Sequence, residues 1–398
     1  MAQRTIQANS YFDGTEYHDK GPYCVLIEDG LIKDILSGDL PPDLELDDDL
    51  DRRAAFIMPG LVEAHCHLFL DGGELDFKNR SAYLKASEDE MLAVARRNVE
   101  ASLTTGITFI RDAGDKWGIN HRIRQEMAAA DKLVPEIRSP GLGIRKPKRY
   151  GGFMAREVET RDEIVAAIKD LLKTGDELKI LLTGIIDFES GTVKGEPQFD
   201  VDEAKLIVET AHDLGRRTFA HCSGLKGLEV AAAAGVDSVE HGFFMTRDIL
   251  EILAEKQIAW VPTFSPVHFQ WARPEIAGWS EESIVNLKGI LDSHSEHIKM
   301  ADEMGVPVVV GSDAGSHGVV HGVAVIDEIK FLVEAGMSMA KALNAATSLP
   351  RRLWGGASAD IKPGDHVDII GLPESPFKNP AMSWQPSWVM MGNDSITL

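Results

Sequence analysis

Cysteine is scarce in this chain of 398 residues, which contains three: Cys24, Cys66 and Cys222. An odd number at irregular spacing excludes a disulfide framework and favours a reducing compartment. Long apolar runs are missing as well, because no stretch reaches the roughly 18 uninterrupted apolar residues that a transmembrane helix needs. Residues 1–9 lack the apolar core of a signal peptide. We therefore expect a cytoplasmic protein with no membrane as a partner.

Positive charge is also in short supply, with 41 Lys and Arg against 63 Asp and Glu and a net charge of -22. A nucleic acid or an anionic surface requires clustered positive charge, so we expect no nucleic-acid partner. Low-complexity segments and short repeats are missing too. What is present is a hydrophobic content of 44%, enough for a large core. The length exceeds a minimal domain and suits one α/β barrel with additions.

The first apolar run of interest ends in two histidines, His65 and His67, after the lead-in Ile-Met-Pro-Gly-Leu-Val-Glu-Ala at 57–64. The run is rich in residues typical of a buried strand that follows a loop. Alternate side chains of a strand share a face, so both histidines can bind one metal ion from the strand end. Cys66 would point the other way. A surface or core pair without a metal is the alternative.

Four further apolar runs contain or precede a residue that can bind a metal. Each has an explanation without a metal: an aspartate that caps a helix, a core histidine with its hydrogen bonds made, or a lysine whose ammonium group reaches out of the core. Six such residues at strand ends are better explained as a metal site than as packing. The four are Lys179 in 177–183, His221 at the end of 217–221, His241 at the end of 238–241, and Asp313 after 306–312.

Strand and helix patterns alternate from about residue 57 onward. This rhythm predicts a parallel sheet, and eight units predict a closed (β/α)8 TIM barrel of the α/β class. Active sites of such barrels lie at the carboxyl ends of the strands, so the six residues should converge. The expected strands are 57–67, 107–111, 136–139, 177–183, 217–221, 238–241, 259–264 and 306–312. The expected helices are 88–104, 121–130, 161–174, 201–214, 224–234, 247–255 and 339–354.

Both ends of the chain carry short strand patterns instead. Residues 23–27 and 31–36 flank an Asp-Gly dipeptide, which predicts a hairpin. Residues 45–53 form an acidic, loop-like stretch, and a short strand is expected at 366–370. We expect the two ends to share a small β-sandwich domain. The predicted division is 1–56 and 359–398 for this domain and 57–358 for the barrel.

These motifs resemble those of the amidohydrolase superfamily over nearly the whole chain. The resemblance rests on Pro-Gly-Leu-x-x-x-His-x-His at 59–67, the strand lysine, the two single histidines and Gly-Ser-Asp-Ala-Gly at 311–315. Within the superfamily, 105–114, 239–242 and 344–347 are similar to the imidazolonepropionase-like and Xaa-Pro dipeptidase-like branch. The resemblance implies a barrel, an end-to-end β-sandwich and a binuclear metal site. His65, His67 and Asp313 would then hold one ion, His221 and His241 the other, and Lys179 would bridge both.

A lysine in such a cluster needs a chemical explanation. A protonated ammonium has no lone pair and would repel two cations. Reaction with carbon dioxide converts the amine of Lys179 into a carbamate, whose two oxygens can bridge the ions. The alternative is that Lys179 faces outward between barrel and helices. The expected cofactors are two divalent metal ions, with zinc favoured over manganese, cobalt or iron, and carbon dioxide as the carbamate.

Two such ions lower the pKa of a bridging water and polarise a substrate carbonyl. Asp313 would take the proton from the bridging hydroxide and deliver it to the leaving group. The predicted reaction is hydrolysis of an amide bond in a peptide-like compound, an N-acyl amino acid or a cyclic amide. A single-metal aminohydrolase, a lactone or ester hydrolase, and a non-catalytic scaffold are the alternatives.

The substrate is expected to be a small molecule with an anionic group and an apolar part. Dipeptidase-like relatives often have a tyrosine two residues after the strand-five histidine, where this chain has Ser223, and Glu63 stands where an aspartate is usual. Four positive charges at 143–152 predict a loop that binds the anionic group, with pairing to the acidic surface as the alternative.

An aromatic-rich connection after strand seven predicts a lid over the apolar part of the substrate. The candidate substrate-binding residues are Arg145, Arg149, Tyr150, Ser223, His268 and His317, with His321 a weaker candidate beside His317. The sequence is compatible with assembly into a homo-oligomer.

Overall fold

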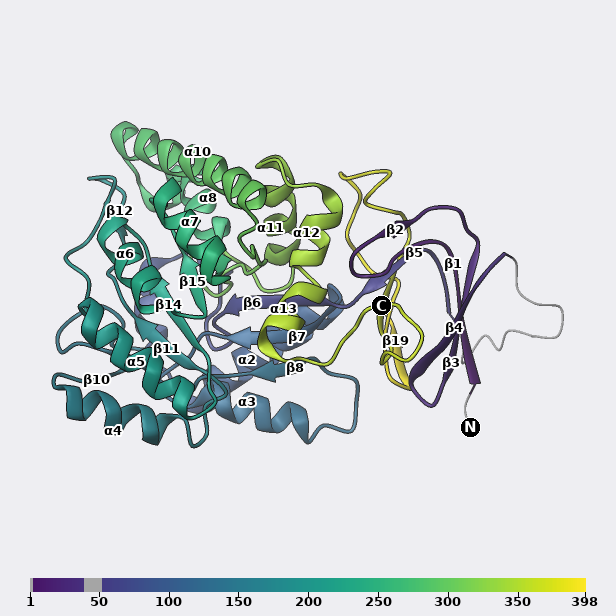
Figure 1. Cartoon of the computed structure of the whole chain (residues 1–398), viewed down its shortest axis with the longest axis horizontal. Helices are drawn as coiled ribbons and strands as arrows, with labels where there is room; N and C mark the ends of the chain where they lie inside the picture. The colour runs from purple at the N-terminus through teal and green to yellow at the C-terminus, as the bar shows by residue number, and fades with distance from the viewer. Residues whose placement is uncertain (1–2, 39–51) are drawn as a thin grey trace.

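The computed structural model describes residues 3–38 and 52–398 (Figure 1). Figure 1 shows two regions side by side, a larger one of helices around strands and a smaller sheet that contains both ends of the chain. The expected acidic stretch at 45–53 lies outside the described residues except for its last two positions, which open a strand.

The smaller region is a sheet built from both chain ends. Its order is β19-β18-β17-β5-β1-β3-β4, with β2 paired to β1. The predicted hairpin is confirmed, because Asp29 (φ 52°) and Gly30 (φ 78°) form a turn between β3 and β4 that suits the strand twist. The strands are β1 (Gln3–Phe12), β2 (Tyr17–His18), β3 (Tyr23–Glu28), β4 (Leu31–Ser37), β5 (Arg52–Pro59), β17 (Asp368–Leu372), β18 (Trp388–Met391) and β19 (Asp394–Thr397).

The larger region contains two parallel sheets. One has the order β6-β7-β8 and the other the order β10-β9-β11-β14-β15-β16, while β12 and β13 form a separate hairpin. Their bounds are β6 (Leu61–Cys66), β7 (Ile107–Asp112), β8 (Glu136–Arg138), β9 (Gly143–Arg145), β10 (Ala155–Glu157), β11 (Leu178–Leu181), β12 (Ile186–Asp187), β13 (Thr192–Val193), β14 (Thr218–Cys222), β15 (Ser238–His241) and β16 (Ala259–Val261).

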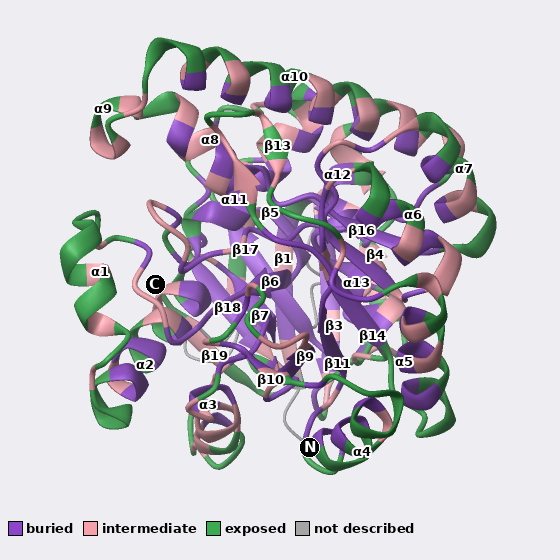
Figure 2. Ribbon diagram, turned by 90° about the vertical axis from the view of Figure 1, so that its left-hand side faces the viewer, coloured by how far each residue is buried: buried purple, intermediate pink, exposed green. Residues whose placement is uncertain are grey.

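The segment 306–314 joins the two sheets on one side. Val309 N donates to Trp260 O at 2.9 Å, and Ala64 N donates to Val310 O at 3.2 Å. On the other side, the chain runs from β8, which pairs with β7, to β9, which pairs with β11. This stretch of chain therefore links the two sheets. Figure 2 shows the buried strands at the centre with helices around them. The fold is the α/β class with the (β/α)8 order that the sequence predicts. The expected strand at 306–312 is wrong in one respect, because this segment occupies the place of the eighth strand but forms isolated bridges, such as Trp260 with Val308, and no continuous strand.

Strand one differs from its predicted range of 57–67. The chain passes from β5 of the small sheet to β6 of the barrel at Gly60, and β5 extends to Pro59. A Cβ at Gly60 would lie 2.1 Å from Thr108 Oγ1 and 2.2 Å from Asp368 Oδ1, so only glycine fits this crossing. We keep 1–56, 57–358 and 359–398 as the proposed division, with the crossing a few residues after its first boundary.

Most predicted helices are present, and several begin with a capping box, such as Ser87 with Glu90 ahead of α2. The expected helix at 339–354 is two helices, broken near Thr347. The helices are α1 (Phe77–Tyr83), α2 (Glu88–Thr104), α3 (Ile119–Ala128), α4 (Arg161–Leu171), α5 (Val201–Asp213), α6 (Leu225–Ala234), α7 (Arg247–Lys256), α8 (Phe264–Ala272), α9 (Pro274–Ala277), α10 (Glu281–Met304), α11 (Val323–Glu334), α12 (Met339–Ala345) and α13 (Ser348–Trp354). Among the described helices, none combines the length and apolar character needed to span a membrane.

Candidate metal centre

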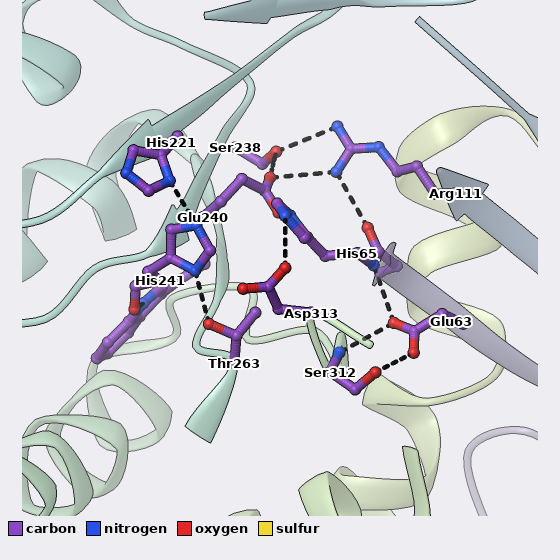
Figure 3. A network of polar contacts seen from close by, with 12 residues as sticks. Glu63, His65, Arg111, His221, Ser238, Glu240, His241, Thr263, Ser312 and Asp313 are labelled. Atoms are coloured by element: carbon purple, nitrogen blue, oxygen red, sulfur yellow. Dashed lines mark hydrogen bonds and ion pairs between the residues drawn. The ribbon is translucent and has the colours of Figure 1, made fainter. Parts of the chain in front are cut away.

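Three of the predicted ligands form a compact group at the carboxyl ends of the barrel strands. His65 and His67 come from the end of β6, and Asp313 follows the eighth strand segment. One ligand atom from each lies within 4.8 Å of the others. Asp313 Oδ1 is 3.8 Å from His65 Nε2 and 3.6 Å from His67 Nε2. Figure 3 shows His65 and Asp313 facing one another across the site.

His65 is oriented so that one ring nitrogen faces this group. Its Nδ1 donates to Glu240 Oε2 at 2.5 Å, because an ionised carboxylate can only accept. The tautomer therefore leaves a lone pair on Nε2, which is buried and has no hydrogen-bond partner among the described residues. Burial lowers the pKa of His65 and takes that of His67 to about 3, so both rings are neutral. An orphaned lone pair beside a second imidazole and a carboxylate fits a divalent metal ion.

A buried chain of charges supports His65 from behind. The guanidinium of Arg111 donates to Glu240 Oε1 at 3.2 Å and to Glu177 Oε2 at 2.6 Å. Its Cζ lies 4.1 Å from the centroid of the Phe219 ring. Sequence reasoning missed this network, although charged residues inside apolar strands were a visible signal. The carboxylate of Glu240 in turn fixes the histidine tautomer.

Glu63 fixes the backbone of the same region. Its carboxylate accepts from His65 N at 3.0 Å, from Ser312 N at 2.9 Å and from Ser312 Oγ. Burial raises the pKa of Glu63 to about 7, while these donors lower it. The side chain therefore joins the first barrel strand to the segment that contains Ser312.

The other two predicted histidines form a second pair. His221 Nδ1 lies 2.8 Å from His241 Nε2, and His241 Nδ1 lies 2.8 Å from Thr263 Oγ1 (Figure 3). Burial lowers the pKa of His221 to about 3 and that of His241 further below its usual range. The two neutral rings are ligands of the type that zinc accepts. Thr263 was not predicted from the sequence.

Backbone strain gathers at the same place. His241 (φ 69°), Thr263 (φ 47°) and Asp313 (φ 55°) all have left-handed backbone conformations. A β-branched residue such as threonine is rarely found there, and strain of this kind costs about 1–3 kcal/mol per residue. Such conformations persist where a site requires a particular side-chain direction, which agrees with the position of all three residues at strand ends.

Lys179 lies on β11 and is 1% exposed, with its Nζ 4.8 Å from the centroid of the Phe219 ring. Burial lowers its pKa to about 8, while the charges of Glu240 and Asp313 raise it. For His65 and His67, the charge of Lys179 is the second cause of the lowered pKa after burial. The Phe219 ring also lies 6.4 Å from that of His65, so the lysine faces the same buried interior and not outward between barrel and helices.

A cavity of about 320 Å³ opens beside the second histidine pair. Three of the predicted substrate-binding residues, Tyr150, Ser223 and His317, line it, together with His221, His241 and Asp313. A larger cavity of about 730 Å³ lies beside α1 and contains none of the six predicted ligands. We therefore take the smaller cavity as the substrate site, because it adjoins the ligands.

The other three predicted substrate-binding residues lie outside the lining of this cavity. Arg145 pairs with Glu157 at 2.7 Å, and Arg149 donates to the carbonyl oxygen of Glu196. His268 belongs to α8, and its ring centroid is 4.5 Å from that of Phe331. The aromatic segment that the sequence suggested as a lid is the helix pair α8 and α9.

Comparison with known proteins gives a consistent family. The sequence profile of a group described as the amidohydrolase family matches residues 56–393. An uncharacterized protein of Mycobacterium tuberculosis is 29% identical over 339 residues, covering 84% of each chain. The ochratoxinase of Aspergillus niger is 25% identical over 372 residues, covering 85% of this chain and 74% of its own. The crystal structure of a Xaa-Pro dipeptidase with bound methionine superposes with a TM-score of 0.83 at 23% identity and covers 100% of both chains.

Proposed function

The chain belongs to the amidohydrolase family, and from that premise we propose that it is a metal-dependent hydrolase that cleaves an amide bond in a small molecule. One observation carries this proposal: the buried Nε2 of His65 has no partner among the described residues and faces His67 and Asp313. The similarity to a Xaa-Pro dipeptidase and to an ochratoxinase supports a hydrolytic reaction.

The ligand set that we propose is the one predicted from the sequence. His65, His67 and Asp313 hold one divalent ion, His221 and His241 hold a second, and Lys179 lies between the two groups. Zinc suits nitrogen and oxygen ligands of this kind. When bound, such ions supply Lewis-acid activation of the substrate carbonyl and of a water molecule.

Lys179 is proposed to act as a carbamate. A buried amine with a pKa of about 8 has a substantial neutral fraction near neutral pH. Its lone pair attacks the carbon of carbon dioxide, and the nitrogen then loses one proton. The product is an anion with two oxygens that could bind the proposed ions, whereas an ammonium has no lone pair with which to do so.

Asp313 is proposed to move the proton during hydrolysis. Burial raises the pKa of its carboxyl to about 7, whereas Lys179 and the hydroxyl of Ser316, 3.0 Å away, lower it. A carboxyl group with a pKa near the working pH can accept a proton and return it to a leaving nitrogen. Tyr150 lines the same cavity, and burial raises the pKa of its phenol, so that it stays protonated and able to donate.

The alternatives differ in how many ions the chain binds. A single-metal aminohydrolase would use one of the two groups, and a non-catalytic scaffold would use neither. Metal analysis of the purified protein by mass spectrometry tests this: two ions per chain supports the proposed hydrolase, one supports the aminohydrolase and none supports the scaffold. A screen of N-acyl amino acids, dipeptides, cyclic amides, esters and lactones then identifies the bond.

Four broader expectations remain part of the proposal. Cys24, Cys66 and Cys222 are buried and form no disulfide with one another, which supports a reducing compartment such as the cytoplasm. The expected anionic group of the substrate has weaker support, since Arg145 and Arg149 lie outside the cavity lining. An apolar substrate part has stronger support, and a homo-oligomer stays open.

A further inference from the structure

The cavity beside the histidines has a continuous apolar wall. The β12–β13 hairpin supplies one side of it, and α8 with the end of β15 supplies the other. The ring of Phe188 packs edge-on against Trp279, with centroids 5.5 Å apart. Asn286 on α10 donates to the carbonyl oxygens of Phe188 at 3.2 Å and Glu189 at 2.9 Å, which anchors the hairpin. The apolar lining residues are Ile185, Ile186, Phe188, Phe243, Pro266 and Val267.

Positive charge is missing from this wall. Among the residues that line the cavity, all of them in the described part of the chain, none is lysine or arginine. The basic loop nearby is paired elsewhere: Arg145 contacts Glu157 at 2.7 Å, and Lys146 contacts Glu203 at 2.5 Å. A substrate carboxylate placed against the apolar lining residues, away from the proposed metal ligands, would therefore be desolvated without a lysine or arginine beside it.

The polar side chains Gln270 and His317, which also line the cavity, already have hydrogen-bond partners. Trp279 Nε1 donates to Gln270 Oε1 at 2.9 Å, and Gln270 Nε2 donates to His317 Nδ1 at 3.1 Å. His317 Nε2 then donates to the carbonyl oxygen of Leu75 at 3.0 Å. Because tryptophan can only donate and a carbonyl can only accept, the chain has one direction, and His317 is neutral. This wall therefore offers little to an anion.

We propose that this cavity selects uncharged amides, carbamates or ureas that carry an aromatic group, and that it rejects the same compounds when they bear a carboxylate there. This inference rests on the proposed function. Hydrolysis forms a bond from the water oxygen to the carbonyl carbon and breaks the carbon–nitrogen bond, and the nitrogen leaves with one proton. The aromatic group packs against the apolar lining that includes Phe188, while the net charge of -22 repels anionic competitors at long range.

The test compares two ligands that differ in one charge. The substrates are 4-chloroacetanilide and 4-carboxyacetanilide, measured as kcat/KM with the zinc-loaded full chain. Their non-hydrolysable methanesulfonamide analogues are measured by titration calorimetry. We expect the neutral analogue to bind at least about tenfold more tightly, since it desolvates no charge. Equal or tighter binding of the carboxylated analogue overturns the inference.

Two measurements keep this inference separate from the proposed function. Faster turnover of the carboxylated anilide overturns the substrate class and leaves amide hydrolysis standing. Preferential binding of the neutral analogue without turnover of either anilide upholds the selectivity of the cavity and counts against amide hydrolysis.

Variants of the apolar wall sharpen the test. Phe188→Ala should weaken binding of the neutral analogue about tenfold, because a large apolar contact is lost. Ile185→Lys should strengthen binding of the carboxylated analogue about tenfold, by supplying the missing cation. Leu214→Lys is the matched control, since Leu214 is 43% exposed against 44% for Ile185 and lies at the C-cap of α5. An Ile185→Lys effect no larger than that of Leu214→Lys overturns the inference.

Discussion

The two histidine pairs of the site are held in different ways. On one side, His65 is backed by the carboxylate of Glu240, which is itself paired with Arg111. On the other side, His241 is backed by the hydroxyl of Thr263, and its second nitrogen contacts His221. Hydrogen bonds to charged groups are about twice as strong as neutral ones. The first pair is therefore preorganised for an ion, whereas the second can adjust when an ion arrives.

The two sides of the site also differ in how their residues are buried. His65 and Glu240 are fully buried, whereas His221 and His241 line the substrate cavity. The first pair holds its position without help from a ligand, and the second contributes to the surface that a substrate meets. We expect changes on the first side to act mainly on metal affinity and changes on the second side to act mainly on turnover.

Lys179→Ala should have the largest effect, because the proposed carbamate would join the two sides. We expect kcat/KM to fall on the order of 10³-fold or more, since ligands that act as a unit are lost together. One or both ions should leave as well, measured by mass spectrometry of the purified variant. A short carboxylic acid should restore part of the activity by replacing the carbamate.

The matched control for that variant is Lys173→Ala, an exposed lysine at the end of the preceding helix region. It should retain full activity and metal content. Retention of both ions and of full activity in Lys179→Ala would remove the bridging role and leave the two sides independent.

Glu240→Gln should rank second and act on the His65 side alone. The amide keeps the shape of the side chain but removes the charge that orients His65 Nδ1–H and balances Arg111. We expect the affinity for the zinc ion on the His65 side to fall about 10–100-fold, as for other partners of metal-binding histidines. Competition with a chelator measures it, with the exposed Glu251→Gln as control. A loss of affinity confined to the zinc ion on the His221 side would contradict the comparison.

The pH dependence of metal affinity should also separate the sides. Burial raises the pKa of Asp313 to about 7, whereas His67 and His221 have pKa values of about 3. As pH falls below 7, Asp313 takes up a proton that competes with the ion, while the histidines stay neutral. Affinity on the His65 side should therefore fall up to about tenfold per pH unit between pH 7 and 5.

Zinc titrations of the apo protein at several pH values check this, and Asp313→Asn should remove the pH dependence on that side. A slope that persists in Asp313→Asn would assign the titration to another group.

Thr263→Ala should have the smallest effect and act on the second side. Loss of one neutral hydrogen bond to His241 corresponds to about 0.5–1.5 kcal/mol, or roughly two- to tenfold in kcat. Thr263→Ser retains the hydroxyl and should behave like the wild type. If Thr263→Ala lowers zinc affinity as strongly as Glu240→Gln does, the two pairs are held equally and the comparison fails.

The convergence of the proposed metal ligands His65, His67 and Asp313 could be predicted from the sequence because their signals are local. A histidine or aspartate that ends an apolar run already specifies its place on the barrel, once eight such runs are recognised. His65, His67 and Asp313 therefore converge as expected. The cavity-lining position of Ser223 follows from the same rule, since it comes directly after β14, and Tyr150 lies in the loop that follows β9.

The supporting groups could not be predicted because they depend on register between distant strands. Arg111, Glu177 and Glu240 meet only when β7, β11 and β15 are aligned. Helix α8 was missed for a similar reason. Its first amides, Phe264 N and Ser265 N, donate to the buried carboxylate of Glu328 at 3.0 and 2.6 Å, and no local side chain caps it.

The basic loop at 143–152 is a second case in which the partners of a side chain could not be predicted from the sequence. Arg145 looked free to bind a substrate, yet its partner Glu157 lies on the adjacent strand β10. A charge count cannot show which charges are already paired. Local patterns therefore predicted which residues carry the chemistry but not which neighbours hold them.

The crossing at Gly60 has a consequence for the order in which the protein is made. Strand β5 lies between β1 and β17, and the strand that continues from it pairs with 310–314. Ribosomes add about 5–20 residues per second, so the emerging His65 and His67 wait many seconds for these partners. The nascent chain therefore cannot pair β6 with this segment, or bring His65 and His67 to Asp313, until residue 314 has been made.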